Sequence, residues 1–167
     1  MLTIRPATLD DLGAITEIYN QAILNTSATF DTNPKTLEEQ KDWFSHHGHK
    51  YPILVAQQGN HIAGWASLSM WSDRCAYADT AEISLYIKEE YRGQGIGQKI
   101  TKAIIRTGQD AGLHTLIDRI TEGNTASIHN AESSGFEHIG VMREVGRKFG
   151  KILDVYLMQK IYNPPAD

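Results

Sequence analysis

The stretch from Thr80 to Arg106 constrains the fold most, because it joins a strand pattern, a glycine-rich turn and a helix pattern in immediate succession. Its first part, through Ile87, alternates apolar side chains with mostly polar ones, as a β-strand requires. After the turn, one helical face is marked by residues at spacings of three and four, namely Ile100, Ala103, Ile104 and Thr107. Such a junction presents the first backbone N–H groups of the helix at the positive end of its dipole. The stretch therefore predicts a backbone anion-binding site.

The glycine-rich turn does not fit either of two well-known nucleotide-binding loops. A P-loop needs Lys and then Ser or Thr after its last glycine, whereas Gly97 is followed by Gln98 and Lys99. A dinucleotide fingerprint needs a third glycine at a fixed spacing and an acidic residue about 20 residues further on, and the glycines here do not follow that spacing. A turn that only connects the strand to the helix remains the structural alternative.

The length of the chain predicts a single domain over residues 1–162, with a frayed tail at 163–167. A chain of 167 residues can bury a sizeable core without metals or disulfides. Its hydrophobic and charged fractions, 41% and 22%, are ordinary for a globular protein. The net charge of −4 provides no basic field for nucleic acid, so the expected partners are small molecules.

The cysteine content and the first residues of the chain indicate the cellular compartment. Cys75 is the only cysteine, so no intrachain disulfide can form. Residues 1–8 lack the basic and then apolar order of a signal peptide, and no apolar run approaches the length of a membrane span. We therefore expect a cytoplasmic protein without a membrane partner.

The rest of the chain supplies strands and helices on both sides of the central unit. Thr8 with Asp11 and Thr36 with Glu39 form capping-box patterns that open two helices, and another helix follows Asn124. Further strands are expected at 2–5, 53–56, 61–68, 115–120, 139–145 and 152–159, the last two joined by a basic turn at 146–151. This order predicts an α/β (α+β) fold with a mixed, mostly antiparallel central sheet and flanking helices.

Three histidines close together suggest a metal site at first sight. His46, His47 and His49 lie near the end of the second predicted helix, but no cysteine or carboxylate accompanies them at ligand spacing. We therefore interpret this segment as a solvated helix end and expect no metal.

The glycine loop resembles the Arg/Gln-x-x-Gly-x-Gly/Ala pyrophosphate loop of the GNAT superfamily of acyl-CoA-dependent N-acyltransferases, which Arg92, Gly95 and Gly97 match. Further blocks resemble the phosphinothricin and methionine sulfoximine acetyltransferase family: 18–20, 26–30 with Pro34, 80–87, and 145–150 with Asp154. The resemblance implies acetyl-CoA as co-substrate and acetylation of the α-amino group of a small amino acid. It also implies a GNAT-like sheet whose strands at 80–87 and 115–120 are parallel and splay apart around the cofactor.

The resemblance assigns residues to acetyl-CoA. The backbone of residues 85–87 would pair with the pantetheine amides, the loop 92–98 would hold the diphosphate, and the last helix would face the same molecule. A simple helix N-cap is the alternative role of Asn124. The implied cofactor-binding residues are Leu85, Tyr86, Ile87, Arg92, Gly93, Gln94, Gly95, Ile96, Gly97, Gln98, Asn124, Ser127 and Ser133.

The chemistry requires a proton acceptor, because an α-ammonium group must lose a proton before it attacks a thioester. Glu82 is the candidate, since it matches the glutamate of the family's Glu-x-Ser-x-Tyr block and lies mid-strand, where carboxylates are depleted. It would act directly or through a water, and a backbone N–H near Leu85 would stabilise the oxyanion. The alternative is an exposed residue on a solvated face of the strand.

The sequence departs from the family pattern at two positions. Ala131 stands where relatives carry the His, or other GNAT enzymes the Tyr, that protonates the departing thiolate, and His129 on the same helix points elsewhere. Ser72 stands where an arginine near the substrate carboxylate is common. The expected substrate-binding residues are Phe30, Arg74, Tyr77, Arg147 and Lys148.

Two other functions remain open. Ala131 is compatible with an acyl-CoA-binding sensor that has lost catalysis, and the same fold could serve a peptide or protein N-acetyltransferase. Cys75 as an acyl carrier lacks a nearby Cys/His motif. A homodimer is expected, because related enzymes build the substrate pocket at a subunit contact.

Overall fold

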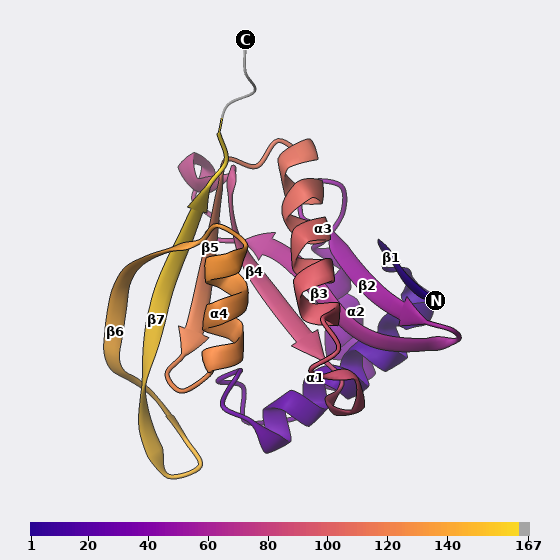
Figure 1. Ribbon diagram of the computed structural model, residues 1–167, viewed down its shortest axis with the longest axis horizontal. Helices are drawn as coiled ribbons and strands as arrows, with labels where there is room; N and C mark the ends of the chain where they lie inside the picture. Colours follow the sequence, from indigo (N-terminus) through magenta and orange to yellow (C-terminus); the bar gives the residue numbers. More distant parts are fainter. Residues whose placement is uncertain (164–167) are drawn as a thin grey trace.

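The computed structural model describes residues 1–163 and contains a seven-stranded mixed sheet in the order β1-β2-β3-β4-β5-β7-β6 (Figure 1). Neighbouring strands are antiparallel except β4 and β5, which are parallel. This confirms the predicted fold class. The predicted tail lies outside the described residues except for Asn163. The strands are β1 (Leu2–Pro6), β2 (Ile53–Gln58), β3 (His61–Met70), β4 (Thr80–Ile87), β5 (Thr115–Thr121), β6 (Glu137–Lys148) and β7 (Lys151–Ile161).

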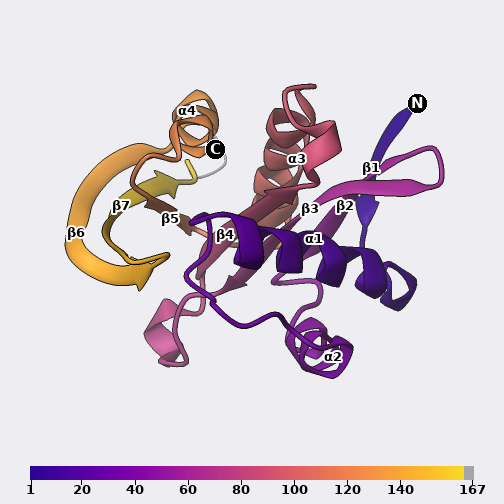
Figure 2. The same cartoon turned by 90° about the horizontal axis from the view of Figure 1, so that it is seen from below.

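Helices cover both faces of the sheet (Figure 2). On one face lie α1 (Leu12–Asn25) and α2 (Leu37–Ser45); on the other lie α3 (Ile96–Asp110) and α4 (Thr125–Ser133). Both predicted capping boxes are confirmed, although the one at Thr8 opens a 3₁₀ turn that leads into α1. None of the helices in residues 1–163 combines the length and apolar composition that crossing a bilayer requires.

The core follows from the two-residue period of the strands, which points successive side chains to opposite faces. In β3, Trp65 joins the cluster that contains Ile15 of α1, whereas its neighbour Ala66 joins the cluster that contains Ile104 of α3. All four of these side chains are almost completely buried. Burial of both faces fixes the register of the central strands, because a slip by one residue would exchange the faces.

The β6–β7 hairpin is longer than predicted. The basic turn expected at 146–151 shrinks to Phe149 and Gly150, so that Arg147 and Lys148 belong to β6. Both turn residues have positive φ angles, 50° and 73°, as the two-residue turns of tight hairpins require. This change moves two predicted substrate residues from a loop onto a strand.

The interpretation of the histidine segment is wrong for His47. Its ring nitrogens lie 2.8 Å from the carbonyl oxygen of Trp43 and 2.9 Å from Oγ of Ser69, so that it ties α2 to β3. Burial lowers the pKa of His47. Within residues 1–163 no group of three or more His, Cys, Asp or Glu side chains is placed to hold a metal ion.

Candidate active site

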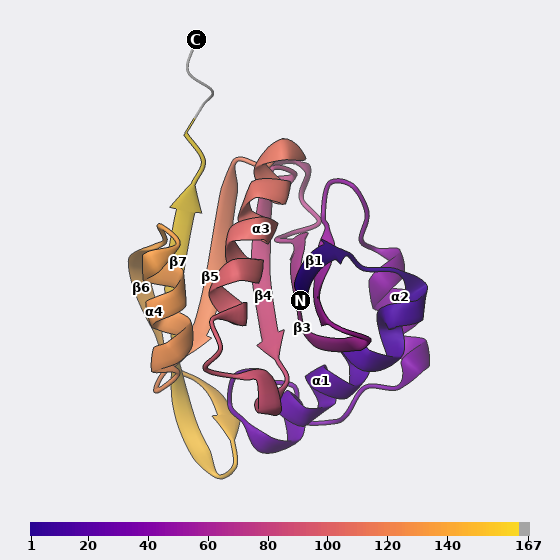
Figure 3. The same ribbon diagram turned by 45° about the vertical axis from the view of Figure 1, so that its right-hand side comes forward.

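The parallel strands β4 and β5 separate after a short paired segment. Residues 80–82 of β4 pair with residues 115–117 of β5, and the next residues of β4 and β5 pair only with β3 and β7, respectively. The two strands diverge from this point in Figure 3. Each therefore has one backbone edge that no neighbouring strand uses in the described part of the chain. This fork agrees with the splay that the family resemblance implied.

A cavity of about 500 Å³ occupies the fork. Its walls come from β4, β5, α4, the loop between α1 and α2, and the β6–β7 hairpin. Among its lining residues are Glu82, Leu85, Tyr86, Asn124 and Ser127, all predicted for catalysis or cofactor binding. The cavity therefore has the unpaired edge of β4 on one side and helix α4 on another.

The glycine loop at the end of β4 has the backbone of an anion site. Gly93 and Gly95 have φ angles of 74° and 75°, which other residues rarely adopt, and a Cβ at either position would meet nothing within 4 Å. Gly95 is the N-cap of α3, and no side chain caps the helix. Arg92 Nε donates to the carbonyl oxygen of Ile87 at 3.1 Å, which anchors the loop to β4. The free N–H groups that follow can bind a diphosphate.

The residues of the fork fit the extended arm of an acyl-CoA. An amide chain laid along the free edge of β4 can pair with its backbone as an added strand does. On the α4 side, Asn130 Oδ1 is buried and has no hydrogen-bond partner within residues 1–163, so it is an acceptor that a ligand N–H would satisfy. The uncapped N-terminus of α3 lies at the end of β4, where its free N–H groups can bind a diphosphate.

Glu82 is held by Arg119, a residue that the sequence analysis missed. Arg119 Nε and one terminal nitrogen lie 2.6 and 2.7 Å from the two carboxylate oxygens. The Glu82 side chain is 21% exposed, so it is not a solvated strand residue. Hydrogen bonding to Glu82, and to a lesser degree its charge, raises the pKa of Arg119. Two parallel hydrogen bonds fix the plane of the carboxylate as well as its position.

Asp118 is a further carboxyl group that lines the cavity, and the sequence analysis missed it. It pairs across the ladder with the fully buried Met158, and its side chain emerges on the opposite face of β5 from Arg119. Burial, and to a lesser degree the charge of Glu82, raises the pKa of Asp118 to about 7. Two adjacent charged residues inside an apolar strand were the available signal, since charges are depleted there.

The wall on the α1 side carries hydroxyl groups and one carboxylate. Tyr19 Oη donates to Oδ2 of Asp31 at 2.5 Å and lies 3.0 Å from Oγ1 of Thr29. The Tyr19 and Tyr86 rings meet edge to face with centroids 5.0 Å apart. Burial raises the pKa of both tyrosines above its ordinary value, so both remain protonated. This wall offers acceptors for an ammonium group.

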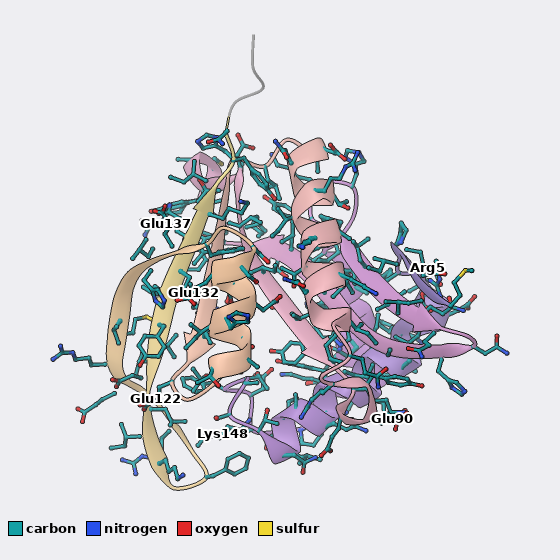
Figure 4. All side chains as sticks on the ribbon, in the orientation of Figure 1. Arg5, Glu90, Glu122, Glu132, Glu137 and Lys148 are labelled. Carbon is teal, nitrogen blue, oxygen red and sulfur yellow. The ribbon has the colours of Figure 1, made fainter. Side chains whose placement is uncertain are left out.

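The β6–β7 hairpin closes the cavity against the loop after α1. Lys148 Nζ donates to the carbonyl oxygen of Thr29 at 2.7 Å. Figure 4 labels Lys148 among the side chains of the β6–β7 hairpin. Its side chain is buried, and desolvation lowers the pKa of Lys148 although Asp31 opposes the shift. The Phe30 ring lies directly against Gly146, where a Cβ would collide with it. Lys148 is therefore a clamp between hairpin and loop, and its contact with substrate remains a prediction.

Some of the other predicted residues line the cavity and others do not. Asn124 is the N-cap of α4, since its Oδ1 accepts from the Ser127 N–H at 3.3 Å, and both line the cavity. Ala131 also lines the cavity and is buried. Four predicted residues are exposed and lie outside the cavity of this chain: Ser133, Arg74, Tyr77 and Arg147. Ile87 and the loop residues Gln94, Ile96, Gly97 and Gln98 also lie outside this cavity, and Ile96 is buried. The roles of all these residues stay predictions.

Comparison with known proteins agrees with this geometry. Residues 1–137 match the family described as the acetyltransferase (GNAT) domain. An L-methionine sulfoximine/L-methionine sulfone acetyltransferase from Pseudomonas aeruginosa is 37% identical over 164 residues, covering 97% of this chain and 95% of the relative. A phosphinothricin N-acetyltransferase from Streptomyces coelicolor is 33% identical over 156 residues, covering 91% of each. The crystal structure of a phosphinothricin acetyltransferase from Sinorhizobium meliloti in complex with acetyl-CoA has a TM-score of 0.92 at 33% identity, covering 96% of this chain and 88% of the other.

Proposed function

Because this chain belongs to the acetyltransferase (GNAT) family and is an N-acetyltransferase, we propose that it acetylates the α-amino group of a small amino acid or close analogue. The proposed substrates are of the phosphinothricin, methionine sulfoximine and methionine sulfone type, in keeping with the names of its relatives. The observation that carries the proposal is the fork between β4 and β5. It begins at Glu82 and opens toward a helix N-terminus that can bind a diphosphate.

Acetyl-CoA would enter the fork as the co-substrate and supply an activated thioester. The N–H groups after Gly95 would bind its diphosphate, and the backbone of residues 85–87 would pair with its pantetheine amides. Asn124 uses its oxygen to cap α4, which leaves its Nδ2 group to donate to the same arm.

The amino group would approach from the side of Glu82, which takes up its proton directly or through a water. Near neutral pH, deprotonating an α-ammonium costs about 1.5 to 4 kcal/mol, which a positioned base offsets. Arg119 holds the carboxylate in a single orientation, and Asp31 with Tyr19 provides acceptors nearby. No covalent intermediate with the enzyme is needed.

We further propose a homodimer in which the exposed predicted residues complete the substrate pocket. The β6–β7 hairpin carries the apolar side chains of Ile139, Val141, Val145, Phe149 and Ile152, each about half exposed. Burial in a subunit contact would remove this apolar surface from water. Arg74 and Arg147 would then meet the substrate carboxylate across the contact. Light scattering should give twice 18.6 kDa at micromolar concentration, and a monomer mass would contradict the dimer.

Thiol release from acetyl-CoA in the presence of an amine panel tests the activity. Methionine sulfone, methionine sulfoximine and phosphinothricin should each give turnover, whereas N-terminal peptides should not. Turnover with peptides alone would favour a peptide or protein acetyltransferase. Stabilisation by acetyl-CoA without thiol release for any amine would favour the sensor, which the replacement at Ala131 makes conceivable.

A further inference from the structure

We propose that Asp118 is the general acid that protonates the departing thiolate, the role that Ala131 leaves open. This inference rests on the proposed function, because a thiolate departs only if the enzyme transfers an acetyl group. It concerns a different residue and a different step from the proton uptake by Glu82. Three features of the structure support the inference. They are the position of Asp118 in the fork, the groups that surround it, and the sheet that separates its carboxyl group from that of Glu82.

Asp118 lies where β4 and β5 begin to separate. The ladder between β4 and β5 ends at the pair Glu82–Ile117, and Asp118 is the next residue of β5. Its side chain points to the same face of β5 as those of Leu116 and Ile120, which belong to the core under α3 and α4. It therefore enters the cavity on the helix side of the sheet, the side on which α4 presents Ala131.

The carboxyl groups of Glu82 and Asp118 differ in their partners. Both oxygens of Glu82 accept hydrogen bonds from Arg119 on the α1 side, which pairs its charge. No hydrogen bond or ion pair of the described residues involves the Asp118 carboxyl group, and burial favours its neutral form. When two carboxyl groups lie in such different environments, one can stay ionised and accept a proton while the other stays neutral and donates one. Here Glu82 is the acceptor and Asp118 is the donor.

Few charged groups surround Asp118. The α3 and α4 side chains that line the same cavity are uncharged, among them Thr101, Asn130 and Ala131. The cross-strand partner of Asp118 on β7 is the apolar Met158. The charged or titratable groups that line the same cavity are Glu82 and Tyr86 on β4, Arg119 on β5, and Tyr19 and Asp31 on the α1 side. Both tyrosines stay protonated, and the charge that raises the pKa of Asp118 is that of Glu82.

The proton balance of the step is closed. When the C–S bond breaks, its electron pair moves to sulfur, the carbonyl re-forms, and the Asp118 carboxyl group gives its proton to sulfur, which yields the thiol and a carboxylate. The protons that the ammonium loses pass to Glu82 and then to solvent. Asp118 regains one proton from solvent, so one proton is released for each acetyl group transferred.

The test compares the pH dependence of kcat/KM for the wild type and Asp118→Asn. At pH 6 the variant should be about 10²-fold slower, the low end for general acid catalysis, because a thiol with a pKa near 8.5 leaves comparatively well. Above pH 7 the ratio of wild type to variant should fall by about tenfold per pH unit, since the wild type loses its acid. A loss that does not change with pH would make Asp118 a structural residue and overturn the inference.

A rescue variant and a measurement without catalysis complete the test. Adding Ala131→His to Asp118→Asn should restore most of the activity, whereas adding Ala131→Leu, which fills space without a proton, should not. If Asp118→Asn does not fold, ¹³C NMR of the wild type without acetyl-CoA should show the Asp118 carboxyl group titrating near neutral pH. A group already ionised at pH 5 would refute the assignment. A wild type inactive with every amine would instead refute the proposed function.

Discussion

Arg119 holds Glu82 through two hydrogen bonds of 2.6 and 2.7 Å at the point where β4 and β5 part. The pair joins the two strands across the last rung of their ladder, because Glu82 lies opposite Ile117, two residues before Arg119 on the same face. Arg119 also lies 5.7 Å from the centroid of the Trp71 ring, which limits its own freedom. The carboxylate therefore occupies a fixed place where β4 and β5 begin to separate.

A double-mutant cycle on this pair tests whether Arg119 acts through Glu82. Arg119→Gln should lower kcat by about tenfold, because it removes the orienting hydrogen bonds, and should leave the effect of acetyl-CoA on the melting temperature unchanged. In the Glu82→Gln background, Arg119→Gln should leave kcat almost unchanged, because the effects of residues that act as a unit are not additive. Steady-state kinetics of the four proteins gives the result. Arg143→Gln on exposed β6 is the matched control, and additive losses would contradict the coupling.

Gly95→Val should abolish the stabilisation by acetyl-CoA. The β-branched side chain disfavours the φ angle of 75° and obstructs the N–H groups before α3. For the wild type, ligand at 100 times its dissociation constant should add about 2.7 kcal/mol to the free energy of unfolding. Gly59→Val is the matched control, because Gly59 also has a positive φ, 61°, and free space around it but lies in the β2–β3 turn. Equal responses of both variants to acetyl-CoA would argue against the loop as the diphosphate site.

Gly146→Val should disturb the closing of the β6–β7 hairpin over the cavity. A side chain at this position collides with the Phe30 ring, and overpacking of this kind typically costs about 1–3 kcal/mol of stability. We expect a lower melting temperature and a raised KM for the amine, with the affinity for acetyl-CoA kept. Gly140→Val, on the same strand but with nothing within 4 Å, controls for strand propensity. An unchanged KM would show that Phe30 does not shape the amine site.

The sequence predicted the elements that local patterns encode. The bounds of β4, a helix that follows the glycine-rich turn, and a cap at Asn124 all follow from period, glycine and capping chemistry. The helix begins earlier than expected, at Ile96 inside the turn. It did not predict contacts between residues far apart in the chain. Arg119 meets Glu82 only because β5 lies parallel to β4, and no local pattern encodes that partner.

Lys148 illustrates the same limit. Its basic neighbours and the following glycine predicted a basic turn, yet Lys148 belongs to β6, is buried and donates a hydrogen bond to Thr29. Asp118 was overlooked for a related reason. Its significance depends on the cavity into which it points, and that cavity forms only once strands, helices and hairpin are assembled.

The role of Glu82 itself is decided by the pH dependence of Glu82→Gln, which keeps the shape and hydrogen bonding of the side chain but removes the proton acceptor. If Glu82 is the base, the variant should bind acetyl-CoA normally and lose about 10²- to 10⁴-fold in kcat. Part of the loss should return at high pH, where the amine is already deprotonated in solution and the enzyme no longer has to offset about 1.5 to 4 kcal/mol. A raised KM with little change in kcat and no recovery would mean that Glu82 only binds the ammonium. Glu137→Gln on the exposed edge strand β6 should behave as wild type throughout, and Glu82→Gln kinetics that match this control would remove Glu82 from the mechanism.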